Sequence, residues 1–231
     1  MRIIAIAAPF LACAALLPAN TPQERLKESA SVVSEIMGTP DNGIPQDLVD
    51  KAQCAVIIPN LKKGAFVVGG EYGKGFAICR NSSGSGWGAP AAVKMEGGSV
   101  GFQIGGSSTD VVMLVMNRNG MDKLTADKFT LGADAAVAAG PVGRTANAST
   151  DVKMSAEILA WSRSKGLFAG ISLKGATLRP DNDENQHLYG RAVTNREILN
   201  GEVKAPAGAN DLAAAMDKYS MRGQPNAERK K

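Results

Sequence analysis

Residues 65–80 read AFVVGGEYGKGFAICR, and this stretch decides the fold class. Two short apolar runs, at 65–69 and 75–80, flank the glycine-rich segment 70–74, and this pattern predicts two strands joined by a turn. Further apolar or alternating runs lie at residues 52–58, 93–95, 100–105, 111–116, 133–139, 157–161 and 168–173. Short strands separated by turn residues predict a small, antiparallel, glycine-rich sheet that closes into a barrel-like core.

Helical patterns flank this sheet at both ends of the chain. Thr21 and Pro22 begin a helix over 21–37, in which apolar residues recur at three- and four-residue spacing. Further helices are predicted at 45–51, 184–189, 194–199 and 210–219. The fold class is therefore α+β. The predicted organisation is a signal segment at 1–19, a helical segment at 20–51, a β-rich domain at 52–200, and a C-terminal helix with a charged tail at 201–231.

The composition excludes several classes of function. The 231 residues are 44% hydrophobic, which excludes a disordered low-complexity chain. His187 is the one histidine and no C-x-x-C pair occurs, so neither a metal site nor a cofactor is expected. The net charge of +4 is a mild excess. It permits contact with anionic surfaces but does not require nucleic acid as a partner.

The N-terminus has the features of an export signal. Arg2 precedes about 15 nearly apolar residues, which is short for a membrane span. Residues 11–13 (LAC) resemble a bacterial lipoprotein cleavage box, which would leave a lipidated Cys13 as an anchor in the outer membrane. Ordinary cleavage near Ala15 or Ala19 is the alternative. Either route predicts a periplasmic mature protein.

Two further cysteines, Cys54 and Cys79, lie in predicted strands. An oxidising compartment would permit a disulfide between them. In the predicted meander, however, Cys54 begins the first strand and Cys79 ends the third, which puts them at opposite ends of the sheet. We therefore expect two buried, unpaired thiols.

Residues 97–101 (GGSVG) match the G-x-S-x-G pattern of serine hydrolases around Ser99, and His187 follows later in the chain. That motif requires a strand before the serine and a helix after it. Here an alternating strand follows Ser99 instead. A hydrolase that uses Ser99 and His187 is therefore the weakest of the functions considered, and no catalytic residue is predicted.

Six basic residues fall at predicted turns or strand ends: Lys62, Lys63, Lys74, Arg163, Lys165 and Lys174. Scattered, solvated charge is one interpretation. The other is that several turns meet at one rim of the barrel and form a shallow site for anionic lipid headgroups. In that interpretation these six residues bind the headgroup.

Several blocks of sequence together carry a resemblance to a known family. They are AVIIP at 55–59, GAFVVGGEYGKG at 64–75, WGAP at 87–90, GGSVGFQIG at 97–105, GAD at 132–134, AAGPVGR at 138–144, SRSKGLFAG at 162–170, and Asn185 with Tyr189 and Gly190. From Ala52 to about Gly190, the chain resembles a SYLF domain, also called the Ysc-eighty-four family.

The resemblance implies a non-catalytic, lipid-binding module. Eukaryotic members bind phosphoinositides, fungal members also bind actin, and membrane binding in the family relies on a basic amphipathic N-terminal helix. The helix predicted at 21–37 carries two basic residues against three acidic ones, so it is not net basic. Export would also keep this chain away from actin. Whether the helix inserts into lipid or packs on the barrel stays open.

The leading hypothesis is a lipid- or membrane-surface-binding module of the bacterial cell envelope, whose partner is an anionic phospholipid surface. The alternative is an envelope scaffold that binds a protein. Binding that survives high salt and needs no lipid would favour the scaffold, because attraction to headgroups is screened by salt.

Overall fold

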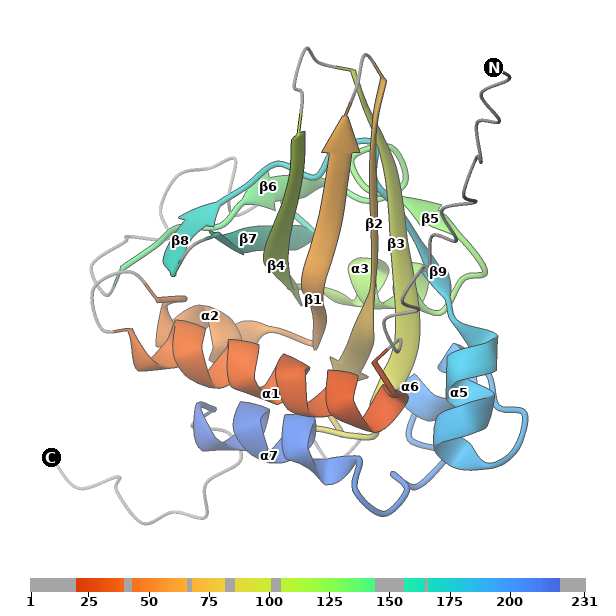
Figure 1. The fold of residues 1–231 in the computed structure, drawn as a ribbon. Coiled ribbons are helices and arrows are strands. Elements are labelled where there is room, and N and C mark those ends of the chain that lie inside the picture. The colour runs from red at the N-terminus through yellow and green to blue at the C-terminus, as the bar shows by residue number, and fades with distance from the viewer. Residues whose placement is uncertain are drawn as a thin grey trace, which may run out of the picture.

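A strongly curled sheet forms the centre of the structure (Figure 1). The computed structural model describes residues 20–39, 43–65, 68–81, 86–100, 105–143, 156–164 and 166–220. The strands are β1 (Cys54–Ala65), β2 (Val68–Cys79), β3 (Ala91–Val100), β4 (Gly105–Val115), β5 (Phe129–Thr130), β6 (Val137–Ala139), β7 (Ile158–Ser164), β8 (Leu167–Gly170) and β9 (Thr177–Pro180).

Across the sheet the strands follow the order β5-β9-β3-β2-β1-β4-β7-β6, and β8 also pairs with β7. Neighbouring strands are antiparallel except β6 and β7, which run parallel. Because β5 and β6 are the two ends of this order, the described strands form a half-barrel. The predicted α+β class, with a curled glycine-rich sheet between helices, is confirmed.

The helices lie mainly across the lower half of the long strands (Figure 1). They are α1 (Pro22–Gly38), α2 (Gln46–Lys51), α3 (Arg118–Leu124), α5 (Asn182–Tyr189), α6 (Asn195–Leu199) and α7 (Asn210–Lys218). The five helices predicted from the sequence are all present. The sequence pattern did not predict α3, β5 or β9, and of the strand expected at 133–139 only β6 forms. The strand expected at 100–105 falls mainly on residues 101–104, which lie outside the described residues.

Over its lower half the sheet is buried on both faces. Successive residues of a strand point to opposite faces, and the described apolar side chains separate accordingly into two clusters. On the concave face, Ile58 and Met113 pack with Leu124 of α3. On the convex face, Phe76 and Trp161 belong to the cluster that α1, α2 and α7 cover.

Helix α1 packs on the convex face of the sheet. Thr21 and Glu24 form a capping box at its start, and Pro22 occupies the first turn. Its apolar side is buried in the convex cluster through Leu26, Val32, Val33 and Ile36. In this conformation α1 therefore packs on the sheet and does not offer its apolar side to lipid.

The hairpin of β1 and β2 is longer than predicted. Residues 70–74 are not a turn, as the sequence suggested, but lie within β2, which runs unbroken from Val68 to Cys79. Gly73 explains this continuity, because a Cβ atom there would lie 2.6 Å from Cγ2 of Ile58 and 2.8 Å from Cδ1 of Leu61. Glycine here leaves the space that Ile58 and Leu61 of the neighbouring strand occupy, so it marks close packing between paired strands and not a turn.

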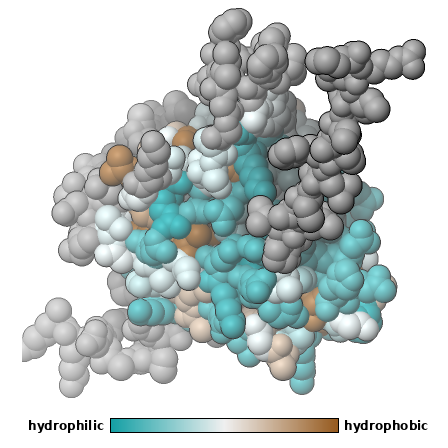
Figure 2. All heavy atoms as spheres, in the orientation of Figure 1, coloured by the Kyte–Doolittle hydropathy of each residue, from teal (hydrophilic) through white to brown (hydrophobic). Residues whose placement is uncertain are grey.

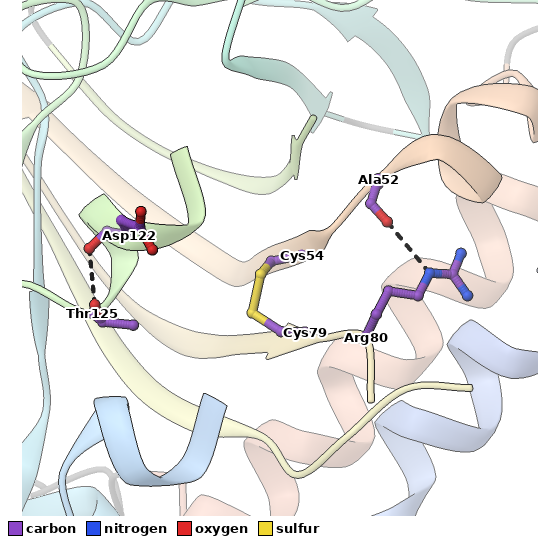
Figure 3. Close-up of a disulfide and its surroundings, with 6 residues drawn as sticks. All are labelled: Ala52, Cys54, Cys79, Arg80, Asp122 and Thr125. Carbon is purple, nitrogen blue, oxygen red and sulfur yellow. Dashed lines mark hydrogen bonds between the residues drawn. A yellow bond between two sulfur atoms is a disulfide. The ribbon is translucent and has the colours of Figure 1, made fainter. Parts of the chain in front are cut away.

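The prediction of two unpaired thiols is wrong, for the same reason. Since 65–80 contains one strand rather than two, Cys79 ends the strand next to β1, and Cys54 and Cys79 are directly opposite in the register. The two sulfur atoms form a disulfide (Figure 3). Arg80, the next residue, donates from Nε to the carbonyl oxygen of Ala52 at 3.3 Å and ties the same strand ends together.

Two asparagine side chains, rather than a neighbouring strand, hydrogen-bond the edge of β3 at Ala92. Asn185 on α5 accepts from Ala92 N at 2.7 Å, and Asn195 on α6 donates to Ala92 O at 3.1 Å. The two amides are joined by a bond of 2.6 Å from Asn185 Nδ2 to Asn195 Oδ1. Both side chains are buried, so without them the N–H of Ala92 would be left without a hydrogen-bond partner in a site that water does not reach.

Loss of the disulfide should lower stability. For a sequence separation of 25 residues, replacing Cys54 and Cys79 by serine should reduce the free energy of unfolding by about 3 kcal/mol. Urea denaturation of the variant and of oxidised wild-type protein measures the difference. Two free thiols in the mass spectrum of the unreduced, folded protein would show that the bridge does not form.

The asparagine pair gives a second prediction. Asn185→Ala leaves the N–H of Ala92 and the Oδ1 of Asn195 without partners in a buried site, so it should cost about 3 kcal/mol in urea denaturation. Asn182→Ala, on the exposed side of the same helix, is the matched control and should change stability by less than about 0.5 kcal/mol. Equal stabilities for the two variants would contradict the assigned network.

Candidate functional site

Above α1, none of the described helices covers the convex face of the sheet, and its side chains become polar. Strand alternation and register place ten residues on this convex polar face: Lys62, Tyr72, Lys74, Lys94, Glu96, Ser108, Asp110, Arg163, Thr177 and Arg179. In the orientation of Figure 1, Figure 2 shows hydrophilic side chains over much of the sheet above α1.

A cluster of ion pairs lies at one end of this face, where β2 meets α1 and α5. Lys74 Nζ is 2.6 Å from Asp181 Oδ2 and 3.2 Å from Glu184 Oε2, and Arg25 of α1 pairs with Glu184. Burial works to lower the pKa of Lys74, but the pairing with both carboxylates outweighs it and raises the pKa above the usual lysine value. Lys74 is thus a charged structural link between three elements.

A second ion-pair cluster lies at the other end, where β4 and β7 meet the end of α1. Arg163 Nη2 is 2.6 Å from Asp110 Oδ2, and the same guanidinium pairs with Glu35 of α1. The other oxygen of Asp110 accepts from Asn60 N at 2.9 Å, at a β1 bulge where Asn60 has a φ of 53°. Burial raises the pKa of the Asp110 carboxyl and lowers the pKa of Arg163.

Two further lysines of the convex polar face have no ion-pair partner among the described residues: Lys62 on β1, between the two clusters, and Lys94 on β3, on the far side of Lys74. Lys62 is exposed and lies directly opposite Tyr72, whose side chain is 46% exposed. Lys94 is half-buried and lies directly opposite Lys74. These are the cations of the face that are free to attract an anion from outside.

The structure brings three of the six predicted headgroup residues to one face. Lys62, Lys74 and Arg163 lie on the convex polar face. Lys63 points to the opposite face and pairs with Glu71 at 3.2 Å.

The other two residues of that set lie elsewhere. Lys174 lies in the turn before β9, where Leu173 and Ala176 pack in the concave cluster, so it is on the concave side. Lys165 lies outside the described residues.

The sequence analysis missed Lys94, Tyr72 and Arg179. A signal was present for Lys94, because it alternates with Val93 and Met95, both of which are buried in the concave cluster. Tyr72 lies in the segment predicted as a turn, and Arg179 lies where no strand was predicted. Both errors came from the misplaced strand boundaries in those two segments.

The hydrolase hypothesis does not fit the geometry. Ser99 lies near the end of β3 and pairs with Gly69 toward the hairpin ends, and residues 101–104, which follow β3, lie outside the described part of the chain. His187 is exposed on α5, which docks on β3 at Ala92, seven residues and thus roughly 23 Å farther down the strand. Ser99 and His187 therefore cannot form a catalytic pair in this conformation.

The described part of the chain offers few other kinds of site. Its His, Cys, Asp and Glu side chains form no group of three that could hold a metal ion. Within the same residues, no helix combines the length and the apolar character needed to cross a membrane. A small apolar crevice lies between α1, α2, α7 and β4, and it belongs to the convex core.

Comparison with known proteins agrees with the fold and with the sequence blocks. Residues 96–219 match the family model Ysc84, described as "Las17-binding protein actin regulator". The chain is 32% identical over 218 residues to SH3 domain-containing YSC84-like protein 1 of Bos taurus, covering 90% of this chain and 63% of that protein.

Two fungal proteins are also similar. SH3 domain-containing protein PJ696.02 of Schizosaccharomyces pombe is 37% identical over 172 residues, covering 73% of this chain and 40% of that protein. LAS seventeen-binding protein 3 of Saccharomyces cerevisiae is 32% identical over 189 residues, covering 80% of this chain and 41% of that protein. This chain thus spans less than two thirds of these relatives. Since the family model covers more than half of the chain, the protein belongs to the Ysc84 family, whose shared unit is the SYLF domain.

Proposed function

We propose that this chain is a non-catalytic module that attaches to an anionic lipid surface of the bacterial cell envelope through its convex polar face. The observation that carries the proposal is the exposed Lys62, which together with Lys94 leaves uncompensated positive charge on a face that no described helix covers. Each lysine near an anionic membrane contributes on the order of 1 kcal/mol. Lys74 and Arg163 add to the positive electrostatic potential of the face, but each forms an ion pair with a carboxylate of the protein.

The envelope location is supported by the sequence of the N-terminus and by the disulfide. Structural disulfides persist in oxidising compartments, of which the periplasm is one. In this proposal residues 1–19 direct export, and Cys13 is the candidate for a lipid anchor. Export would separate the chain from cytosolic actin, so the actin regulation named in the family description is not proposed for it.

A protein partner is the second candidate function. The yeast relative is named for binding to LAS seventeen, and this chain presents an apolar side chain that a partner could cover. Leu167, at the start of β8, is 73% exposed. A partner held by such a contact would stay bound in high salt, whereas attachment to headgroups would weaken as salt rises.

Charge reversal on the convex polar face tests the proposal. Lys62→Glu should weaken binding to vesicles that contain phosphatidylglycerol by about 30-fold, since it removes one attraction and adds one repulsion of about 1 kcal/mol each. Lys174→Glu changes the net charge equally but lies on the concave side, so it should lose less than about threefold. Co-sedimentation with vesicles measures both. Equal losses in the two variants would show that net charge alone, and not this face, governs binding.

The mass of the native N-terminus tests the location. Purified from a bacterial membrane fraction, the mature chain should begin at Cys13 with the added mass of a diacylglycerol and an acyl chain, or else after Ala15 or Ala19 without lipid. The first result establishes an anchor and the second a free periplasmic protein. A mature chain that retains Met1 would contradict export with cleavage.

A further inference from the structure

One row of side chains crosses the convex polar face above the helices (Figure 1). Tyr72 lies at its centre, directly opposite Lys62 on one side and Glu96 on the other. Thr177 and Ser108 continue the row at its two ends. Four strand spacings place the Cα atoms of these two end residues roughly 19 Å apart. These five residues form the tyrosine row.

The tyrosine row offers hydrogen-bonding groups of both kinds around an exposed aromatic ring. Tyr72 is 46% exposed, and the side chain of Glu96 beside it is 43% exposed. The ammonium group of Lys62 only donates hydrogen bonds, whereas the carboxylate of Glu96 only accepts them. Arg179 Nε, 3.6 Å from Glu96 Oε2, helps to position that carboxylate. Within the row the two charges cancel, so the row itself favours neither an anion nor a cation.

The sheet next to the tyrosine row is bare. Gly98, Gly70 and Gly64 lie directly opposite one another in the next row of the convex face, and all three are exposed. Elsewhere in the sheet glycine makes room for a neighbouring strand, since a Cβ atom at Gly75 would lie 1.9 Å from Ile57 O. At Gly64 and Gly98, no heavy atom of the described residues lies within 4 Å of that position. Internal packing therefore does not require these two glycines, and bare backbone in a strand lets a ligand approach closely.

The chemistry of the two rows points to one class of ligand. An apolar protein surface would meet only one exposed ring, that of Tyr72, and a charged ligand would meet Lys62 and Glu96 together. A neutral sugar chain needs donors and acceptors for its hydroxyl groups and an aromatic face for its C–H groups, and the tyrosine row supplies all three. We propose that the tyrosine row, with the bare backbone beside it, binds a neutral polysaccharide chain. This activity goes beyond the proposed attachment to lipid.

The probe is chitohexaose, a neutral hexasaccharide, and titration calorimetry with the full mature chain measures its affinity. Chitohexaose should bind at least about tenfold more tightly than N-acetylglucosamine, because only the longer chain contacts several residues of the row. Raising the salt concentration from about 50 to about 500 mM should change this affinity by less than about twofold, because the ligand carries no charge. Binding to anionic vesicles should weaken over the same range of salt.

Gly70→Val separates the site from the fold. A Cβ atom at this position would lie 3.9 Å from Gly97 O, an ordinary contact, so the melting temperature should not fall. The valine lies two residues from Tyr72 on the same face and blocks the bare backbone, so it should weaken chitohexaose binding by at least about tenfold. Ser107→Val adds the same side chain on the concave side of β4 and should retain the wild-type affinity. An unchanged affinity in Gly70→Val would overturn the proposal.

Tyr72→Leu tests the aromatic ring and gives an independent result if Gly70→Val is unstable. The side chain is exposed, so the fold should persist, while chitohexaose binding should weaken by about tenfold. Binding to anionic vesicles should stay within about twofold of wild type, because the substitution changes no charge.

The remaining outcomes separate this inference from the proposed function. If wild-type protein does not bind chitohexaose, or if Tyr72→Leu binds it as tightly as wild type, the polysaccharide site is wrong, and vesicle binding can still support attachment to lipid. Chitohexaose binding without vesicle binding would support the polysaccharide site and overturn the proposed function alone.

Discussion

The close pairing of β1 with β2 governs the architecture of the sheet. At Gly73 a side chain would press against Ile58 and Leu61 of the neighbouring strand, and glycine avoids this contact. The register of the pair sets Cys54 opposite Cys79 and decides which residues of both strands face the concave core. The same register decides that Lys62, Tyr72 and Lys74 share the convex face.

The convex face changes character where α1 stops covering it. Where helices cover the face, Phe76 of β2 and Trp161 of β7 are buried. Two residues away on the same strands, where this cover ends, the side chains are Lys74 and Arg163. Ion pairs from α1 reach both of these cations or their carboxylate partners, so they are held at the border between the covered and the open part. Attraction for an external anion is left to positions without such partners.

Several residues of the family blocks have structural roles here. Asn185 completes the edge of β3 through Ala92, and Tyr189 donates to Pro90 O at 2.8 Å. Trp161 donates from Nε1 to Pro141 O at 2.8 Å, and its ring covers Gly140 so closely that a Cβ atom there would overlap it. These blocks mark the fold of the family, whereas Lys62 and Lys94, the two lysines of the convex polar face without ion-pair partners among the described residues, lie outside them.

The sequence by itself determined the α+β class, the five flanking helices and the glycine-rich sheet, because periodicity and helix caps such as Thr21 and Pro22 are local signals. Its set of candidate binding residues includes Lys62, Lys74 and Arg163, which the sheet brings to one face. Only the tertiary structure decided that residues 70–74 belong to a strand, that the two cysteines meet, and that Lys94 lies directly opposite Lys74. The physical reason is that a glycine reads as a turn along the chain, and only the neighbouring strand shows that it is a close contact.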